Sequence, residues 1–220
     1  MIIDKTTYEL ILPFGSIIYS SKLTEDELSL AKDLAEQSRA KDDASYRLVG
    51  NIKEQREDIS IDVQFRSIVD KHIKDFMKHQ IDKQSLTIIK DADKPYNLNF
   101  EEMEYSLGQG PWFNFMSCGE FNPLHNHHGE VSGIIMIQVP EEISDENLDN
   151  NNPNYLTRGQ LEWVSADSQN YRITPQEGSI FLFPAYLKHT VYPFQSNVER
   201  ITSSWNVYDI NFKKSMEAEA

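Results

Sequence analysis

The chain has 220 residues, of which 39% are hydrophobic, and its formal charge is −14 at pH 7. This composition allows a folded core and excludes a disordered, collagen-like or disulfide-stapled chain, since Cys118 is the only cysteine. A chain this acidic gains little from counterion release, so we expect no nucleic acid and no membrane among its partners. No apolar stretch approaches the roughly 20 residues of a membrane span, and the start does not resemble a secretory signal. We therefore expect a cytoplasmic protein.

The first hundred residues have a mixed, helix-rich pattern. The apolar segment from Tyr8 to Tyr19 predicts strands that are interrupted by proline and glycine. Thr24 and Glu27 have the spacing of a capping box, and apolar residues follow at helical intervals. This pattern predicts a helix over Glu25 to Arg39.

A second helix is predicted from Ile61 to His79. Apolar residues recur there every three or four positions and form one stripe. The two histidines of this segment, His72 and His79, are expected at the surface or the edge of the helix.

From about residue 100 the pattern changes to short strands separated by turn residues. Many short strands with turn signals between them are typical of a sandwich or a barrel. The predicted strands are Trp112 to Met116, Val131 to Val139, Gln160 to Val164, Ser179 to Phe183, Thr190 to Phe194 and Arg200 to Val207.

One long polar segment, Glu141 to Gly159, separates two of these strands. It is acidic and rich in asparagine, so we expect a long loop that is either a lid or a mobile insertion. We expect a single domain over residues 1–220. In it, residues 1–100 brace a β-rich core formed by residues 101–212, and residues 213–220 form a frayed tail.

Histidines are the clearest chemical signal in the second half. His125 and His127 are two residues apart, so on an extended segment both imidazoles point to one side and can bind one ion. A third ligand has to come from elsewhere, and His189 follows a later strand and turn. Two close ligands and one distant ligand leave coordination positions open, as a catalytic metal requires.

A second signal lies eleven residues after His189. Alternation along the strand that begins at Arg200 places Arg200, Thr202 and Ser204 on one face. A guanidinium with a hydroxyl two residues further on is suited to binding a carboxylate.

These residues together resemble the iron(II)- and 2-oxoglutarate-dependent (2OG-Fe(II)) oxygenases, especially a small bacterial and phage-borne group. The resemblance rests on three segments: Gly119 to His127 with Val131-Ser-Gly following, Gly178 to Val191, and Glu199 to Asn206. It implies a mainly β (α+β) fold, a double-stranded β-helix of the jelly-roll or cupin-like type, with the N-terminal helices packed on one sheet.

The resemblance also implies the cofactors and their residues. His125 and His189 would bind Fe(II), and Arg200 would pair with the distal carboxylate of 2-oxoglutarate with help from Thr202. Trp112 to Phe115 would line the same cavity, with Asn114 and Asn206 as polar contacts. The implied reaction converts 2-oxoglutarate and O2 to succinate and CO2 and hydroxylates a substrate C–H bond.

The sequence departs from the family at one ligand. Most such oxygenases have Asp or Glu two residues after the first histidine, where this chain has His127. Either His127 is the second ligand in an all-histidine site, or the register shifts to His128-Gly129-Glu130. We prefer His125 and His127 as ligands, with Glu130 as an alternative ligand or as an acceptor that orients a ligand imidazole.

Two other functions remain open from the sequence. The spacing around His125, His127 and His189 also resembles cupin motifs, so a cupin-type metalloenzyme or metal-binding protein without 2-oxoglutarate is the main alternative. A non-catalytic β-sandwich binding module is the other. The acidic composition favours a cationic or neutral substrate, either a small molecule or a peptidyl residue, and a homodimer is compatible with the sequence.

Overall fold

The computed structural model describes residues 8–11, 15–88, 99–146 and 157–212. The larger sheet has the order β1-β2-β10-β7-β12-β5-β3, and β4 pairs with β12 outside this path. Its strands are β1 (Tyr8–Ile11), β2 (Ile18–Lys22), β3 (Gln55–Glu57), β4 (Glu104–Ser106), β5 (Trp112–Met116), β7 (Val131–Gln138), β10 (Ser179–Pro184) and β12 (Arg200–Asn211).

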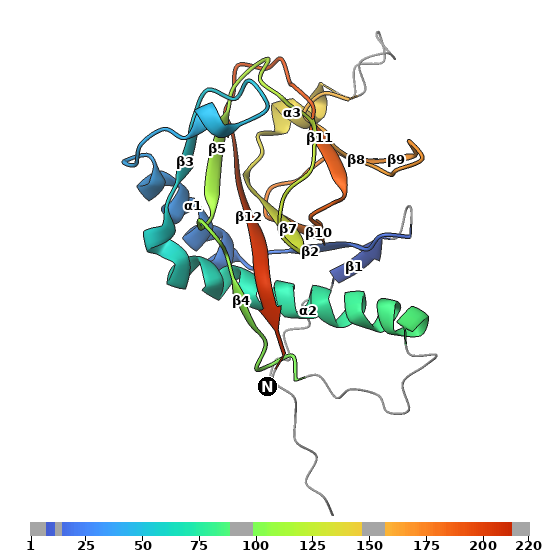
Figure 1. The fold of residues 1–220 in the computed structure, drawn as a ribbon. Helices are drawn as coiled ribbons and strands as arrows, with labels where there is room; N and C mark the ends of the chain where they lie inside the picture. The colour runs from blue at the N-terminus through green and yellow to red at the C-terminus, as the bar shows by residue number, and fades with distance from the viewer. Residues whose placement is uncertain (1–7, 12–14, 89–98, 147–156, 213–220) are drawn as a thin grey trace, which may run out of the picture.

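The smaller sheet has the order β6-β11-β8-β9. Its strands are β6 (Asn122–His125), β8 (Leu161–Val164), β9 (Asn170–Ile173) and β11 (Lys188–Val191). All pairings in both sheets are antiparallel, and the chain from β5 to β12 passes back and forth between them. This is the expected double-stranded β-helix, a jelly-roll arrangement (Figure 1).

Helix α1 (Glu25–Ser38) begins where the sequence predicts it. The Thr24 hydroxyl accepts a hydrogen bond from the Glu27 backbone N–H, and the Glu27 carboxylate accepts one from the Thr24 N–H. This reciprocal cap satisfies two donors that would otherwise be unpaired at the helix start. The buried residues Ala31, Leu34 and Ala35 form the face that packs on the sheet.

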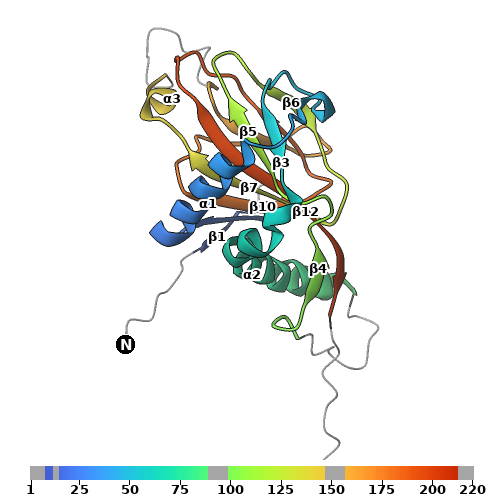
Figure 2. The ribbon, with the colours of Figure 1, turned by 90° about the vertical axis from the view of Figure 1, so that its left-hand side faces the viewer.

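Helix α2 (Asp62–Ile88) lies across the outer face of the larger sheet together with α1 (Figure 2). Its stripe from Phe65 to Met77 is buried against outward-facing residues of the strands, including Trp205. Gly133 makes room for that indole, because a Cβ at Gly133 would lie 2.1 Å from Trp205 Cζ2. In the part of the chain that the structure describes, no helix is long and apolar enough to cross a bilayer.

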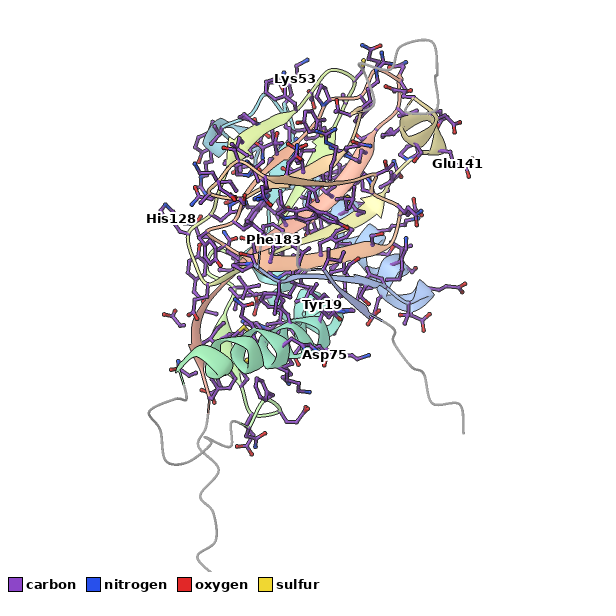
Figure 3. The ribbon with its side chains drawn as sticks, turned by 90° about the vertical axis from the view of Figure 1, so that its right-hand side faces the viewer. Tyr19, Lys53, Asp75, His128, Glu141 and Phe183 are labelled. Atoms are coloured by element: carbon purple, nitrogen blue, oxygen red, sulfur yellow. The ribbon has the colours of Figure 1, made fainter. Side chains whose placement is uncertain are left out.

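The second core lies between the two sheets. Side chains alternate along each strand, so Ile135 and Leu182 face the helices whereas Ile134 and Phe183 face the smaller sheet. Figure 3 shows Phe183 at this inner position. Trp163 of β8 closes the core from the other side. One end of the space between the sheets is therefore filled with apolar side chains.

The first hundred residues contribute more than helices to the fold. Strands β1, β2 and β3 extend the larger sheet at both edges, and short 3-10 turns, Ser45–Arg47 and Ile59–Ile61, flank β3. The segment predicted as one loop begins with helix α3 (Glu141–Asp145), while residues 147–156, like the tail 213–220, lie outside the described residues. The single-domain organisation stays a prediction.

The expectation that His72 lies at the surface is wrong. His72 is 1% exposed, and its Nδ1 lies 2.8 Å from the Tyr19 hydroxyl on β2. Tyr19 is labelled in Figure 3, on the sheet side of α2. His72 lies on the apolar face of α2 and is therefore buried in the core. There its ring contacts the Tyr19 hydroxyl of the sheet. Burial lowers the pKa of His72 below its ordinary value.

This burial predicts an acid-sensitive contribution to stability. Because the pKa of His72 is lower in the folded than in the unfolded chain, the unfolded chain binds the proton more readily. Stability is therefore complete above about pH 7 and falls as the pH drops below about 6.5, by at most about 1.4 kcal/mol per pH unit. His72→Asn, which keeps a polar partner for Tyr19, should unfold in urea with a shallower dependence on pH between 5 and 7.5. Identical slopes for both proteins would contradict this account, since the other histidines titrate in both.

Candidate metal and 2-oxoglutarate site

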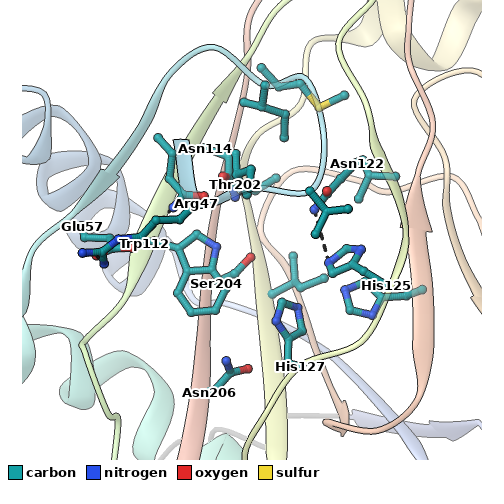
Figure 4. Close-up of a pocket in the computed structure, with 18 of the residues that line it drawn as sticks. Arg47, Glu57, Trp112, Asn114, Asn122, His125, His127, Thr202, Ser204 and Asn206 are labelled. Carbon is teal, nitrogen blue, oxygen red and sulfur yellow. Dashed lines mark hydrogen bonds and ion pairs between the residues drawn. The ribbon is translucent and has the colours of Figure 1, made fainter. Parts of the chain in front are cut away.

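A cavity of about 490 Å³ occupies the open end of the space between the sheets. Its wall is polar because the inward positions of two strands are polar: Asn114 alternates with buried phenylalanines on β5, and Arg200 and Thr202 alternate with Ile201 on β12. Figure 4 shows this wall facing the histidines across the cavity. The same alternation that fills the helix-facing core thus places hydrogen-bonding groups in the cavity.

Three imidazoles meet on the opposite side of the cavity. His125 ends β6 and is the direct partner of His189 on β11, and their ring centroids are 4.3 Å apart. His127 follows two residues after His125, where its backbone N–H donates to the carbonyl of Ala185. The ligand nitrogens of the three residues lie within 4.8 Å of one another. The structure therefore brings together the three histidines singled out from the sequence.

Hydrogen bonds orient two of these rings. His125 Nδ1 lies 2.6 Å from the Pro123 carbonyl and His189 Nδ1 lies 3.3 Å from the Leu187 carbonyl, so each Nδ1–H donates. Burial lowers the pKa of all three imidazoles, that of His127 to about 4, so the rings are neutral at pH 7. A neutral ring that donates from Nδ1 carries its lone pair on Nε2, which is the form that binds a metal.

The alternative register through Glu130 is not what the structure shows. Glu130 is exposed, and its carboxylate accepts a hydrogen bond from the Ile210 backbone N–H at 3.2 Å. It is neither in the group of candidate ligands nor the acceptor for a ligand imidazole, since backbone carbonyls fill that role. His128 is also exposed and lies at the outer edge of the molecule in Figure 3.

Arg200 is a buried cation without a described anion. It is 1% exposed, its Nη1 donates to the Gly159 carbonyl at 2.6 Å, and its Nη2 approaches Met116 Sδ at 2.7 Å. Among the residues that the structure describes, Nε has no partner and no carboxylate pairs with the guanidinium. Burial lowers its pKa to about 10. A buried charge in this state fits an incoming carboxylate.

The other three residues expected to bind 2-oxoglutarate differ in position. Thr202 and Asn114 are direct partners across β12 and β5, and Asn114 Nδ2 donates to the Thr202 hydroxyl at 3.5 Å. Thr202 is thus the next residue after Arg200 on β12 that faces the cavity, and Asn114 lies beside it on β5. Asn206 is six residues beyond Arg200, about 20 Å along the strand, and its side chain accepts from Ser132. Asn206 lines the cavity but cannot contact the same carboxylate as Arg200.

The expectation that the whole segment from Trp112 to Phe115 lines the cavity is half wrong. Trp112 and Asn114 do so, and the Trp112 ring lies 5.7 Å from that of His127. Phe113 and Phe115 point to the opposite face, where they belong to the helix-facing core. The two pairs face opposite ways because successive side chains of a strand point to opposite faces of the sheet.

Several polar residues of the cavity were not singled out from the sequence, among them four that matter for the site. Gln55 and Glu57 lie on β3, and Arg47 lies on the turn before it. Their segment is short and polar, so it carries no apolar alternation that would indicate a strand. Asn122 of β6 lies with its Nδ2 3.3 Å from His125 Nε2, the nitrogen that a metal would need. Asn122 lies in a segment that resembles the oxygenases, whereas the signal for Gln55 and Glu57 was their spacing at i and i+2.

Comparison with known proteins agrees with this geometry. Residues 110–206 match the family described as "Putative 2OG-Fe(II) oxygenase". A search of curated protein sequences found no match.

Several solved structures are similar to the chain at low identity. One is a prolyl-4-hydroxylase from Pseudomonas putida, with 13% identity over 92% of this chain and 93% of that one and a TM-score of 0.47. Another is a prolyl hydroxylase from Trichoplax adhaerens in complex with a peptide fragment of hypoxia inducible factor, with 11% identity, coverages of 94% and 86% and a TM-score of 0.48. A third is HygX from Streptomyces hygroscopicus with nickel, 2-oxoglutarate and hygromycin B bound, with 10% identity, coverages of 89% and 83% and a TM-score of 0.48.

The family match spans all three histidines, Arg200 and Thr202. The resemblance inferred from the sequence is thereby confirmed, together with its cofactors Fe(II), 2-oxoglutarate and O2. Residues 110–206, somewhat under half of the chain, are thus similar to the 2OG-Fe(II) oxygenase family.

Proposed function

We propose that this chain hydroxylates a C–H bond of a small molecule or a peptidyl residue, using Fe(II) held by His125, His127 and His189. The observation that carries the proposal is one cavity that contains three neutral imidazoles and a buried guanidinium with no carboxylate partner among the described residues. When bound, Fe(II) supplies the activation of O2, coupled to the conversion of 2-oxoglutarate to succinate and CO2. The protein positions the reactants.

The chain's own residues have three tasks in this proposal. The three imidazoles would bind the metal, His125 and His189 through Nε2, because the backbone carbonyls of Pro123 and Leu187 accept from the Nδ1–H of these two rings. Arg200 binds the distal carboxylate of 2-oxoglutarate, with Thr202 and Asn114 one position away. Ile134, Met136 and Leu161 line the apolar part of the cavity, and surroundings of low polarity strengthen the charge interactions inside.

The proposed metal set has no carboxylate, so its net charge is one unit more positive than that of a site with two histidines and an acid. The amide of Asn122 must release His125 Nε2 before a metal can bind there. We place Asn206 at the other end of the cavity from 2-oxoglutarate. The net charge of −14 favours a cationic or neutral substrate over a nucleic acid.

The test is anaerobic addition of Fe(II) to metal-free protein, with and without 2-oxoglutarate, followed by visible spectroscopy. We expect a weak charge-transfer band only when both components are present, and succinate formation after O2 is admitted. Metal binding without this band would favour a cupin-type metalloprotein that does not use 2-oxoglutarate. Absence of metal binding would contradict both functions.

A further inference from the structure

The cavity has a second polar wall, which adjoins the proposed 2-oxoglutarate residues, since Gln55 is the direct partner of Asn114. It is formed by Gln55 and Glu57 of β3, which lie outside the segment that matches the oxygenase family. Both side chains point inward, because they are two residues apart on one strand. Across the β3–β5 pair, Glu57 is the direct partner of Trp112. Figure 4 shows Trp112 between Glu57 and His127.

The polar atoms of this wall are acceptors. Gln55 is 3% exposed, and its Nε2 donates to Glu57 Oε1 at 3.5 Å. The Gln55 Oε1 atom is buried and has no partner among the described residues. A buried acceptor without a partner destabilises the ligand-free protein, and a ligand N–H would remove that cost. This oxygen thus lacks a hydrogen-bond donor among the described residues.

The Glu57 carboxylate is occupied from one side only. Arg47 Nη1 donates to Glu57 Oε2 at 2.6 Å and also to Gln109, while the Arg47 side chain is 46% exposed. Within the described ranges, the long contact with Gln55 is the one hydrogen bond of Glu57 Oε1. An ion pair that is half exposed to solvent is weak. A second cation can therefore bind the Glu57 carboxylate together with Arg47 or in its place.

We infer that Gln55, Glu57 and the Trp112 ring form a subsite for a positively charged, N–H-rich group of the substrate. A carboxylate, an amide oxygen and an aromatic face are the three groups that recognise an ammonium or a guanidinium. The Trp112 ring is 5.7 Å from that of His127, so a substrate held here presents its carbon chain to the proposed metal. The inference rests on the proposed function and adds the class of substrate.

The test uses n-butylammonium and n-butylguanidinium as probes, with n-butanol and butyrate as neutral and anionic controls. The full-length protein, loaded with Zn(II) and 2-oxoglutarate, is titrated while the Trp112 Nε1–H signal is followed by ¹H–¹⁵N NMR. Trp163 and Trp205, which are fully buried, serve as internal references, and Trp112→Phe assigns the signal. We expect at least one cation to shift the Trp112 signal with about millimolar affinity, and neither control to do so.

Three variants sharpen the test. Glu57→Gln should weaken cation binding about tenfold or more, because it removes the charge and keeps the shape. Arg47→Ala should strengthen binding by up to about fivefold, because it removes the competing cation. Glu54→Gln is the matched control, since its carboxylate pairs with Arg39 and Arg56 and does not line the cavity.

Equal shifts with butanol, or unchanged affinity in Glu57→Gln, would overturn the inference. The relative affinity of the two cations distinguishes an ammonium from a guanidinium substrate. Failure of Zn(II) or 2-oxoglutarate to bind would instead count against the proposed function, and the cation titration can then be made on the metal-free protein. The two failures are therefore distinguishable.

Discussion

Replacing His189 with alanine should abolish metal binding and oxygenase turnover and leave the protein folded. His189 is the most buried of the three candidate ligands, at 2% exposed, and it is the direct strand partner of His125. Loss of a residue that only orients a metal ligand typically costs 10–100-fold in affinity, so loss of a ligand should cost at least about 100-fold. The measurement is the affinity for Fe(II), or for Co(II) under air, by calorimetry.

The matched control is His128→Ala, because His128 is next to His127 in the chain but exposed and outside the ligand group. It should bind metal as the unmodified protein does. His189→Gln keeps most of the side-chain volume beside Phe183, whose ring lies 4.9 Å from that of His189. If His189→Ala disturbs folding, His189→Gln separates that effect from the loss of a ligand. Undiminished metal affinity in both His189 variants would place the metal elsewhere.

The sequence could predict the histidine group because each step depends on local spacing. His125 and His127 are on one side of an extended segment by parity alone, and the apolar runs before His189 and after Arg200 have a strong strand pattern. The pairing of His189 with His125 is a long-range contact, which spacing alone does not determine. The resemblance to a known family supplied it.

The second cavity wall could not be predicted in the same way. Strand β3 has three polar residues, and pairing with β5 rather than its own propensity holds it in place. Strand alternation predicts that Phe113 and Phe115 share one face and that Asn114 lies on the other. It does not say which of the two faces packs on the helices, because both carry apolar residues in this segment. His72 was misplaced for a related reason, since a polar partner from the sheet made its burial tolerable.

Replacing Arg200 with methionine should abolish 2-oxoglutarate binding while making the ligand-free protein more stable. The guanidinium is fully buried and has no anion beside it among the residues that the structure describes, and the fall of its pKa to about 10 corresponds to a cost of about 3 kcal/mol at neutral pH. Methionine fills similar space without a charge. Because the bond to the Gly159 carbonyl is lost as well, we expect a net gain of about 1–3 kcal/mol in the free energy of unfolding.

The two proteins should then respond differently to 2-oxoglutarate. In the unmodified protein, the ligand carboxylate neutralises the buried charge, and a concentration of 100 times Kd adds about 2.7 kcal/mol to the free energy of unfolding. Arg200→Met should show no such gain, with Kd raised at least about 100-fold and metal affinity unchanged. Urea unfolding with and without 2-oxoglutarate measures both effects. If Arg200→Met is less stable and still binds 2-oxoglutarate, Arg200 stabilises the fold and does not bind the co-substrate. If Arg200→Met is more stable and no longer binds 2-oxoglutarate, the buried charge lowers stability and is needed for binding.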